Sequence, residues 1–297
     1  MKQITFFTEP EWAFGVIHYE LVKHLFVHNV NATVLPWNKQ YTAQEIAELT
    51  NVVEAFVSTP YGVARLIDCY GVPPEKCIAV VHAVLDIECL KTFLPDNVQR
   101  LRAYSAVSEW LIAQSQILGI DRIPSYTPVG INYQSFFTEP SPELRTVGYA
   151  GAINPDNIHR QIKRPWLVEQ VTQQAGLNFC VAHNYHNTWI TMPGFYHAVD
   201  AVIVASTEEG AGLPALEASA AGRLVISTPV GIWLAKAANS GHTVPIEQGQ
   251  FMSATLDLLE MYRDDSTAYR EKCLATQAHA RTYDWSQVIH YWTELFE

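Results

Sequence analysis

The chain has 297 residues, of which 48% are hydrophobic and 16% charged, and its formal net charge is −11. This composition excludes an intrinsically disordered chain and fits a globular protein of one large domain or two of ordinary size. The acidic balance argues against whole-surface attraction to nucleic acid or anionic lipid, although a local basic patch is compatible with it.

Five cysteines are scattered along the chain without a CxxC pair, so the sequence predicts neither a zinc site nor a disulfide framework. A reduced, cytoplasmic compartment is the simplest interpretation. The N-terminus has no signal-peptide core, and no run of about 18 apolar residues predicts a membrane-spanning helix. Peripheral contact with a membrane surface and the oligomeric state are left open.

The first half alternates short apolar runs with segments of helical spacing, which predicts a parallel sheet covered by helices on both faces. Thr42 and Glu45 are spaced for a capping box. In chain order we predict strand Ile4–Phe7, helix Trp12–Val27, strand Ala32–Leu35, helix Thr42–Leu49, strand Val52–Val57, helix Tyr61–Cys69, strand Ile78–Val84, strand Ala103–Val107 and helix Glu109–Leu118.

A stretch rich in Pro and Ser, Pro124–Pro142, interrupts this rhythm and indicates an interdomain connection. The rhythm then restarts. The predicted elements are strand Thr146–Ala150, helix Trp166–Ala175, strand Asn178–Val181, strand Ala201–Ala205, helix Leu213–Ala221, strand Leu224–Ser227, helices Phe251–Tyr262 and Ala268–Arg281, and a last amphipathic helix. We therefore predict an α/β protein with Rossmann-like domains at 1–127 and 128–281, followed by a C-terminal helix within 282–297.

The segment with the clearest chemistry is STEEGAGLPALEASAAGRLVISTPVG, from Ser206 to Gly231. It follows an apolar strand, and ligands of open α/β sheets bind beyond the carboxyl ends of strands. Its glycine loop, followed by Pro214 in the first turn of a helix, offers free backbone amides to a diphosphate. Glu209 precedes the loop, and Glu217 is predicted on the first turn of the helix. Two carboxylates around an anion site suit a nucleotide sugar.

This segment resembles the signature of glycosyltransferase family four and its GT-B relatives. Weaker resemblances are carried by PVGINYQSF, by MPGFYHAVDAVIVAS, by WAFGVIHYELVKHL and by the final helix that contains DW. The resemblance implies a GT-B fold, in which two Rossmann-like doubly wound domains face a central cleft. It assigns the acceptor side to 1–127, the nucleotide-sugar side to 128–281, and a helix that crosses back to the first domain to 282–297.

The resemblance also implies roles for individual residues. Glu217 would bind the ribose hydroxyls of the donor, and Glu209 would bind hydroxyls of its sugar. The backbone of the glycine loop would line the sugar and the phosphates; its residues are Gly210, Ala211, Gly212 and Leu213.

The family places a basic pair against the diphosphate. Lys163 matches the lysine position, whereas the expected arginine is replaced by Ala152, a departure from the pattern. Arg164, or with less support Arg160, is the predicted substitute. A neighbouring guanidinium can supply the same charge.

Two residues of the first half complete the predicted site. His82, at the end of the strand predicted for Ile78–Val84, resembles a family histidine close to the transferred sugar. Gly15 resembles the glycine that lets the first loop approach the donor or the acceptor. The histidines of the first predicted helix, including His18, are predicted to be partly exposed and not to bind metal.

Simpler interpretations remain open at each position. The glutamates also fit a solvated helix face, Lys163 and Arg164 fit surface charges before a helix, and His82 fits a hydrogen-bonded core histidine.

The resemblance implies transfer of a sugar, with retention, from a nucleotide-diphosphate sugar to a saccharide or other acceptor. The donor is a co-substrate, and no cofactor or metal is predicted, because fixed cations can stabilise the leaving diphosphate. Two alternatives are a nucleotide-sugar epimerase of the same fold and a non-catalytic nucleotide-sugar-binding subunit. A dinucleotide-dependent dehydrogenase is disfavoured, because no GxGxxG follows the first strand.

Overall fold

The computed structural model describes residues 1–297 except 11–12, 121–124, 152, 154–158, 183–189 and 234–240. The chain divides into two compact units. Unit 1 comprises residues 1–130 together with 285–297, and unit 2 comprises residues 131–284. Within the described residues, no helix is both long and apolar enough to cross a membrane.

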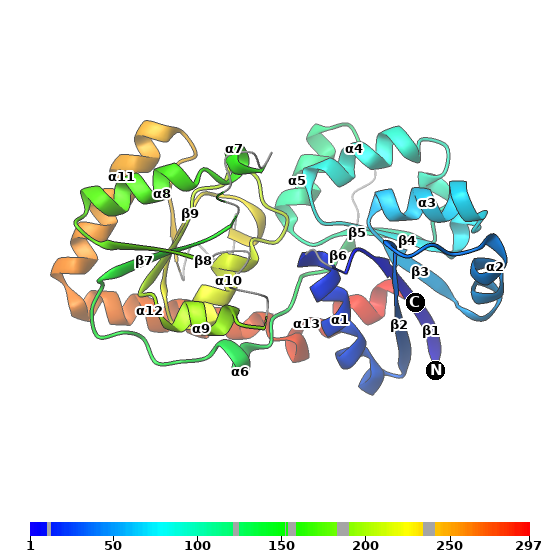
Figure 1. The fold of residues 1–297 in the computed structure, drawn as a ribbon, viewed down its shortest axis with the longest axis horizontal. Coiled ribbons are helices and arrows are strands. Elements are labelled where there is room, and N and C mark those ends of the chain that lie inside the picture. The colour runs from blue at the N-terminus through cyan, green and yellow to red at the C-terminus, as the bar shows by residue number, and fades with distance from the viewer. Residues whose placement is uncertain (11–12, 121–124, 152, 154–158, 183–189, 234–240) are drawn as a thin grey trace. The chain divides into compact units, whose positions relative to one another are not determined.

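Unit 1 is a six-stranded parallel sheet in the order β2-β1-β3-β4-β5-β6, with helices on both faces (Figure 1). Its strands are β1 (Lys2–Thr8), β2 (Val30–Pro36), β3 (Ala55–Ser58), β4 (Cys77–Val81), β5 (Ala103–Ala106) and β6 (Ser125–Tyr126). Its helices are α1 (Ala13–Leu25), α2 (Ala43–Val52), α3 (Pro60–Tyr70), α4 (Val84–Phe93), α5 (Glu109–Ile117) and α13 (Trp285–Leu295). The predicted capping box of Thr42 and Glu45 is confirmed at the start of α2.

The strand predicted for Ile78–Val84 is too long. β4 ends at Val81, and Val84 already begins α4, a helix that the sequence analysis did not predict. The carboxylate of Asp86 causes this turn, because its Oδ2 accepts hydrogen bonds from the backbone amides of His82 (2.7 Å) and Ala83 (3.0 Å). These bonds satisfy amides that would otherwise extend the strand ladder or stay unpaired at the helix start.

Unit 2 is a five-stranded parallel sheet in the order β11-β10-β9-β7-β8. Its strands are β7 (Thr146–Ala150), β8 (Asn178–Ala182), β9 (Ala201–Val204), β10 (Leu224–Ser227) and β11 (His242–Thr243). Its helices are α6 (Tyr133–Phe136), α7 (Arg160–Lys163), α8 (Pro165–Gln174), α9 (Met192–His197), α10 (Leu213–Ala220), α11 (Gln248–Asp264) and α12 (Ser266–Ala280).

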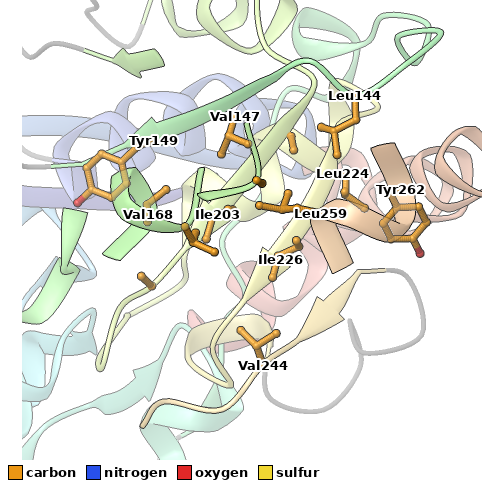
Figure 2. Packing of buried hydrophobic residues seen from close by; sticks show 14 of the residues in the cluster. Leu144, Val147, Tyr149, Val168, Ile203, Leu224, Ile226, Val244, Leu259 and Tyr262 are labelled. Carbon is orange, nitrogen blue, oxygen red and sulfur yellow. The ribbon is translucent and has the colours of Figure 1, made fainter. Parts of the chain in front are cut away.

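Both faces of the second sheet are buried. Successive side chains of a strand point to opposite faces, so each strand contributes to two cores. In β9, Ala201 and Ile203 pack into one core with residues of α8 and α11. Figure 2 shows Ile203 among residues of this core. Val202 and Val204 of the same strand pack into the opposite core, with residues of α9 and α10. A strand that is apolar at every position is therefore what this doubly covered sheet requires.

The last helix of the chain belongs to unit 1. Trp292 of α13 is fully buried, and its Nε1 donates a hydrogen bond to the backbone oxygen of Pro128 at 2.9 Å. Trp285 of the same helix lies against Gly130, where an added Cβ would come within 2.4 Å of the indole. Segments far apart in the sequence thus share one core.

The Trp292 hydrogen bond gives a test of how α13 stabilises unit 1. Trp292→Phe keeps an aromatic ring but leaves the buried oxygen of Pro128 without its donor, so we expect the free energy of unfolding to fall by about 1–3 kcal/mol. Chemical denaturation would measure this loss. Tyr291→Phe, which changes the neighbouring and more exposed residue, is the control. Equal stability of Trp292→Phe and the wild type would contradict the assignment.

Candidate functional site

The sheet order of unit 2 fixes where a ligand can bind. β7 and β9 are neighbours, but the chain leaves β7 for β8 on one side and leaves β9 for β10 on the other. In open α/β sheets this divergence opens a crevice at the carboxyl ends of the two strands. Lys163 follows β7 and Glu209 follows β9, so both predicted residues belong to this switch point.

Lys163 and Glu209 are paired. The Nζ atom of Lys163 lies 2.6 Å from Oε1 of Glu209, and the two side chains are 28% and 10% exposed. Oε1 also accepts a hydrogen bond of 2.7 Å from the hydroxyl of Ser206. The backbone holds the two segments together, because the amide of Thr207 donates to the oxygen of Ile162 at 2.9 Å. Sequence reasoning did not single out Ser206 as a partner of Glu209.

The glycine loop leads directly into α10. Gly212 is the N-cap residue with φ of +80°, a backbone conformation that favours glycine, and Pro214 lies in the first turn, as predicted. The loop packs on a second turn at Gly231, where an added Cβ would lie 2.7 Å from the oxygen of Ala211. Gly210 and Leu213 complete this connection at the start of the helix.

Glu217 lies one turn further along α10 than predicted. The helix begins at Leu213 and has no acidic residue in its first turn, so Glu217 opens the second turn. The helix starts at Leu213 as predicted, but Glu217 is its fifth residue, so the placement of Glu217 in the first turn was wrong. The Oε2 atom of Glu217 accepts a hydrogen bond of 2.7 Å from the hydroxyl of Tyr196, a fully buried residue of α9.

Burial raises the pKa of Glu217 to about 7, although the Tyr196 hydrogen bond acts in the opposite direction. The pKa of the Tyr196 hydroxyl is also raised, first by burial and then by the neighbouring carboxylate. Tyr196 therefore stays a neutral donor that fixes one oxygen of Glu217. Sequence reasoning did not single out Tyr196, although it lies within the quoted MPGFYHAVD stretch.

The two arginines considered as partners of Lys163 differ in their surroundings. Arg164 is buried, and its Nε and Nη1 donate to the backbone oxygens of Ala205 and Ile246, each at 2.6 Å. Two of its three nitrogens thus connect the carboxyl end of β9 to a later loop. The guanidinium of Arg160 lies over the ring of Trp166, 5.0 Å from its centroid, and makes no hydrogen bond or ion pair within the described residues. Ala152, where the family arginine is missing, lies outside the described residues.

Unit 1 contains the remaining two predicted site residues. His82 lies just after β4, and burial lowers its pKa to about 3, so its ring is neutral near pH 7. Gly15 lies in the first turn of α1, where an added Cβ would come within 2.0 Å of the Glu9 oxygen. The close approach of residues 9–10 to the helix is therefore one sufficient reason for glycine at this position.

His18 was predicted to be partly exposed, and this is wrong. The side chain is fully buried, with its ring stacked on Phe6 (centroids 4.7 Å apart) and edge-on to His82 (5.7 Å). Burial and then the neighbouring His82 lower its pKa well below the ordinary value. His18 faces the sheet because α1 packs one side of its surface on β1, and helical spacing alone did not identify that side.

Glu217 provides a test by pH. Its pKa in the folded chain lies above the ordinary value near 4.5, so the native state loses relative stability as pH rises from about 4.5 to about 7. Glu217→Gln removes this titration and keeps an acceptor for Tyr196. We expect its stability relative to the wild type to increase by on the order of 2 kcal/mol between pH 4.5 and pH 8. Urea denaturation at several pH values measures this difference.

Tyr196→Phe is the matched variant for that experiment. It removes the hydrogen bond that lowers the pKa of Glu217, so the loss of stability should continue to higher pH. A stability difference between Glu217→Gln and the wild type that stays constant with pH would contradict the raised pKa.

Arg164 provides a test of structural against ligand-binding roles. Lysine cannot donate to the oxygens of Ala205 and Ile246 with the geometry of the guanidinium. Because at least one buried oxygen then lacks its donor, we expect Arg164→Lys to lower the free energy of unfolding by about 1–3 kcal/mol. Arg160→Lys is the control, with a smaller expected loss. Chemical denaturation without ligand compares the two, and equal losses would contradict the distinction.

Comparison with known proteins shows which sequences this chain is similar to. Residues 149–261 match the family model described as glycosyl transferases group 1. The chain is 29% identical over 120 residues to a D-inositol 3-phosphate glycosyltransferase of Arthrobacter sp., a match that covers 40% of this chain and 28% of the relative. A protein of the same name from Corynebacterium urealyticum is 29% identical over 136 residues, covering 46% of this chain and 32% of that protein. The matched stretch thus spans less than a third of these curated relatives.

Solved structures match over the whole chain. Anabaena HepE in complex with UDP gives a TM-score of 0.68 at 14% identity, with 99% of both chains covered. Sucrose-phosphate synthase from Thermosynechococcus elongatus gives 0.69 at 12% identity, with 100% of this chain and 98% of that chain covered. At such identities the likeness establishes the fold. The chain therefore has the two-domain GT-B fold, and its residues 149–261 are similar to the group 1 glycosyl transferases.

Proposed function

We propose that the protein transfers a sugar from a nucleotide-diphosphate sugar to a hydroxyl-bearing acceptor, with retention of the anomeric configuration and without a metal. The observation that carries this proposal is the arrangement at the switch point of unit 2. Glu209, a glycine loop and the start of α10 follow one central strand, and Lys163 follows its neighbour and contacts Glu209 at 2.6 Å. Glu217 lies one turn into the same helix.

The proposed donor contacts divide along the ligand. Glu217, whose Oε2 is bonded to Tyr196, keeps its other oxygen for ribose hydroxyls. Glu209 binds hydroxyls of the sugar. Backbone amides at residues 210–213 suit the diphosphate, because the start of α10 offers unpaired donors and the positive end of a helix dipole.

Lys163 is the proposed cation for the phosphates. Arg160 is the better-supported second cation, because its guanidinium makes no hydrogen bond within the described residues while Arg164 is bonded to two backbone oxygens. This order reverses the one that the sequence favoured. A second cation from Arg160 would supply the charge that is missing at Ala152.

The proposed reaction breaks the bond between the anomeric carbon and the diphosphate oxygen and forms a bond from that carbon to the acceptor oxygen, whose proton is released. Negative charge grows on the leaving diphosphate. Lys163 and the loop amides would stabilise that charge electrostatically, which is the reason for proposing chemistry without a metal. The acceptor class is a saccharide or another small hydroxyl-bearing molecule. The roles of His82 and Gly15, like the cytoplasmic location, rest on the sequence alone.

A thermal-shift screen against UDP-, GDP-, ADP- and TDP-sugars tests the proposal. A ligand that binds the native state raises the unfolding temperature, and at 100 times its Kd it adds about 2.7 kcal/mol of stability. We expect one nucleotide class to do so. Glu217→Gln should weaken that ligand by about tenfold or more, because hydrogen bonds to a charged group are worth about 1.5–3 kcal/mol.

Glu208→Gln is the matched control, since it makes the same change of charge next to Glu209 without touching a proposed donor contact. Its affinity should stay within about twofold of the wild type. No shift with any of the four classes would overturn the proposal. An isomerised sugar nucleotide formed without an acceptor would instead assign the epimerase alternative.

A further inference from the structure

Lys163 and Glu209, the two side chains proposed to bind the phosphates and the sugar of the donor, are paired with each other. Nζ of Lys163 lies 2.6 Å from Oε1 of Glu209, so the charge of the lysine proposed to bind phosphate is neutralised by the carboxylate proposed to bind the sugar. The Glu209 side chain is only 10% exposed, and charges in such surroundings interact more strongly than in water. Any anion that takes Lys163 must therefore compete with a carboxylate that is already in contact.

Glu209 is held in place on the other side. Ser206 is buried and donates to the same Oε1 at 2.7 Å, and the hydroxyl of Thr228 in turn donates to the backbone oxygen of Ser206 at 2.5 Å. The backbone bond from Thr207 to Ile162 keeps α7 beside the loop. When a ligand arrives, the flexible lysine side chain can turn away, whereas the carboxylate stays at the end of β9.

We propose that Glu209 makes the site discriminate between a sugar nucleotide and the nucleoside diphosphate that remains after transfer. This inference rests on the proposed function. A diphosphate that takes Lys163 leaves Glu209 as a largely buried carboxylate with one hydrogen bond, which is costly. A sugar nucleotide supplies hydroxyls that donate to the released oxygen, so both members of the pair regain partners. A nucleoside diphosphate lacks the transferred sugar and therefore supplies no sugar hydroxyl to Glu209.

The consequence is a site that holds the donor and releases the product. Competition from Glu209 weakens binding of the nucleoside diphosphate more than binding of the sugar nucleotide. Release of product limits the turnover of many enzymes, so a built-in penalty against the spent nucleotide would speed the cycle. Ser206 is a positioning residue in this arrangement, because it keeps the carboxylate at the loop when the lysine leaves.

Isothermal titration of the full chain tests this inference. UDP, GDP, ADP and TDP are each compared with their glucose derivative, on the wild type and on Glu209→Gln. Glutamine removes the charge that competes for Lys163 but keeps a polar side chain of the same shape. We expect the nucleoside diphosphate of the bound class to bind about tenfold more tightly to Glu209→Gln, while its glucose derivative binds no more tightly than to the wild type.

Two further variants separate discrimination from a general change of charge. Glu208→Gln, the matched control, should leave the ratio of the two dissociation constants unchanged. In a Lys163→Met background, Glu209→Gln should tighten the nucleoside diphosphate by less than threefold, because the competition requires the lysine. Circular dichroism of each variant verifies that it is folded.

The outcomes distinguish this inference from the proposed function. Binding of a sugar nucleotide with a ratio that changes less than twofold in Glu209→Gln would overturn the inference and leave the proposed function standing. A tightening of equal size in the Lys163→Met background would also overturn it. Absence of binding by all eight ligands would overturn the proposed function and this inference together.

Discussion

The carboxylate of Glu209 can stay largely buried beyond the carboxyl end of β9 only because it forms an ion pair with a cation and accepts a hydrogen bond from a hydroxyl. Lys163 supplies the cation, Ser206 supplies the hydroxyl, and a backbone bond from Thr207 to Ile162 fixes the distance between their segments. This requirement ties together the ends of β7 and β9, the two strands at which the chain direction diverges. The proposed site lies at this switch point of the sheet, where the charges of the two side chains are balanced.

Glu217 meets the same requirement in a different way. It has a neutral donor, Tyr196, in place of a cation, and its pKa is accordingly raised to about 7 by burial. The two proposed donor carboxylates thus differ in electrostatic character. Glu209 is held by an ion pair with Lys163, and Glu217 by the hydroxyl of Tyr196. A ribose contact at Glu217 and a sugar contact at Glu209 are consistent with this division.

Unit 2 carries its site on a sheet that is packed on both faces. Alternate residues of β9 enter two separate cores, and Arg164 holds the end of that strand to a later loop through Ala205 and Ile246. Such packing limits the movement of the strand ends, so the loop that follows β9 starts from a fixed position. The positioning of Glu209 therefore depends on the packing of β9 and on the hydrogen bonds of Arg164.

The sequence by itself determined the parts of this protein that depend on local order. The strand–helix rhythm, the apolar run of β9, the glycine loop before α10 and Pro214 in the first turn of that helix are all set by neighbouring residues, and the sequence predicted them. It also singled out Lys163 and Glu209 separately. Only the tertiary structure decided that they pair, that Tyr196 bonds Glu217, and that His18 is buried. It also decided that the guanidinium of Arg164 is bonded to backbone oxygens, whereas that of Arg160 makes no such bond to the residues that the structure describes. These contacts join segments far apart in the chain, and periodicity reveals neither which side of a helix faces the sheet nor which oxygen a guanidinium reaches.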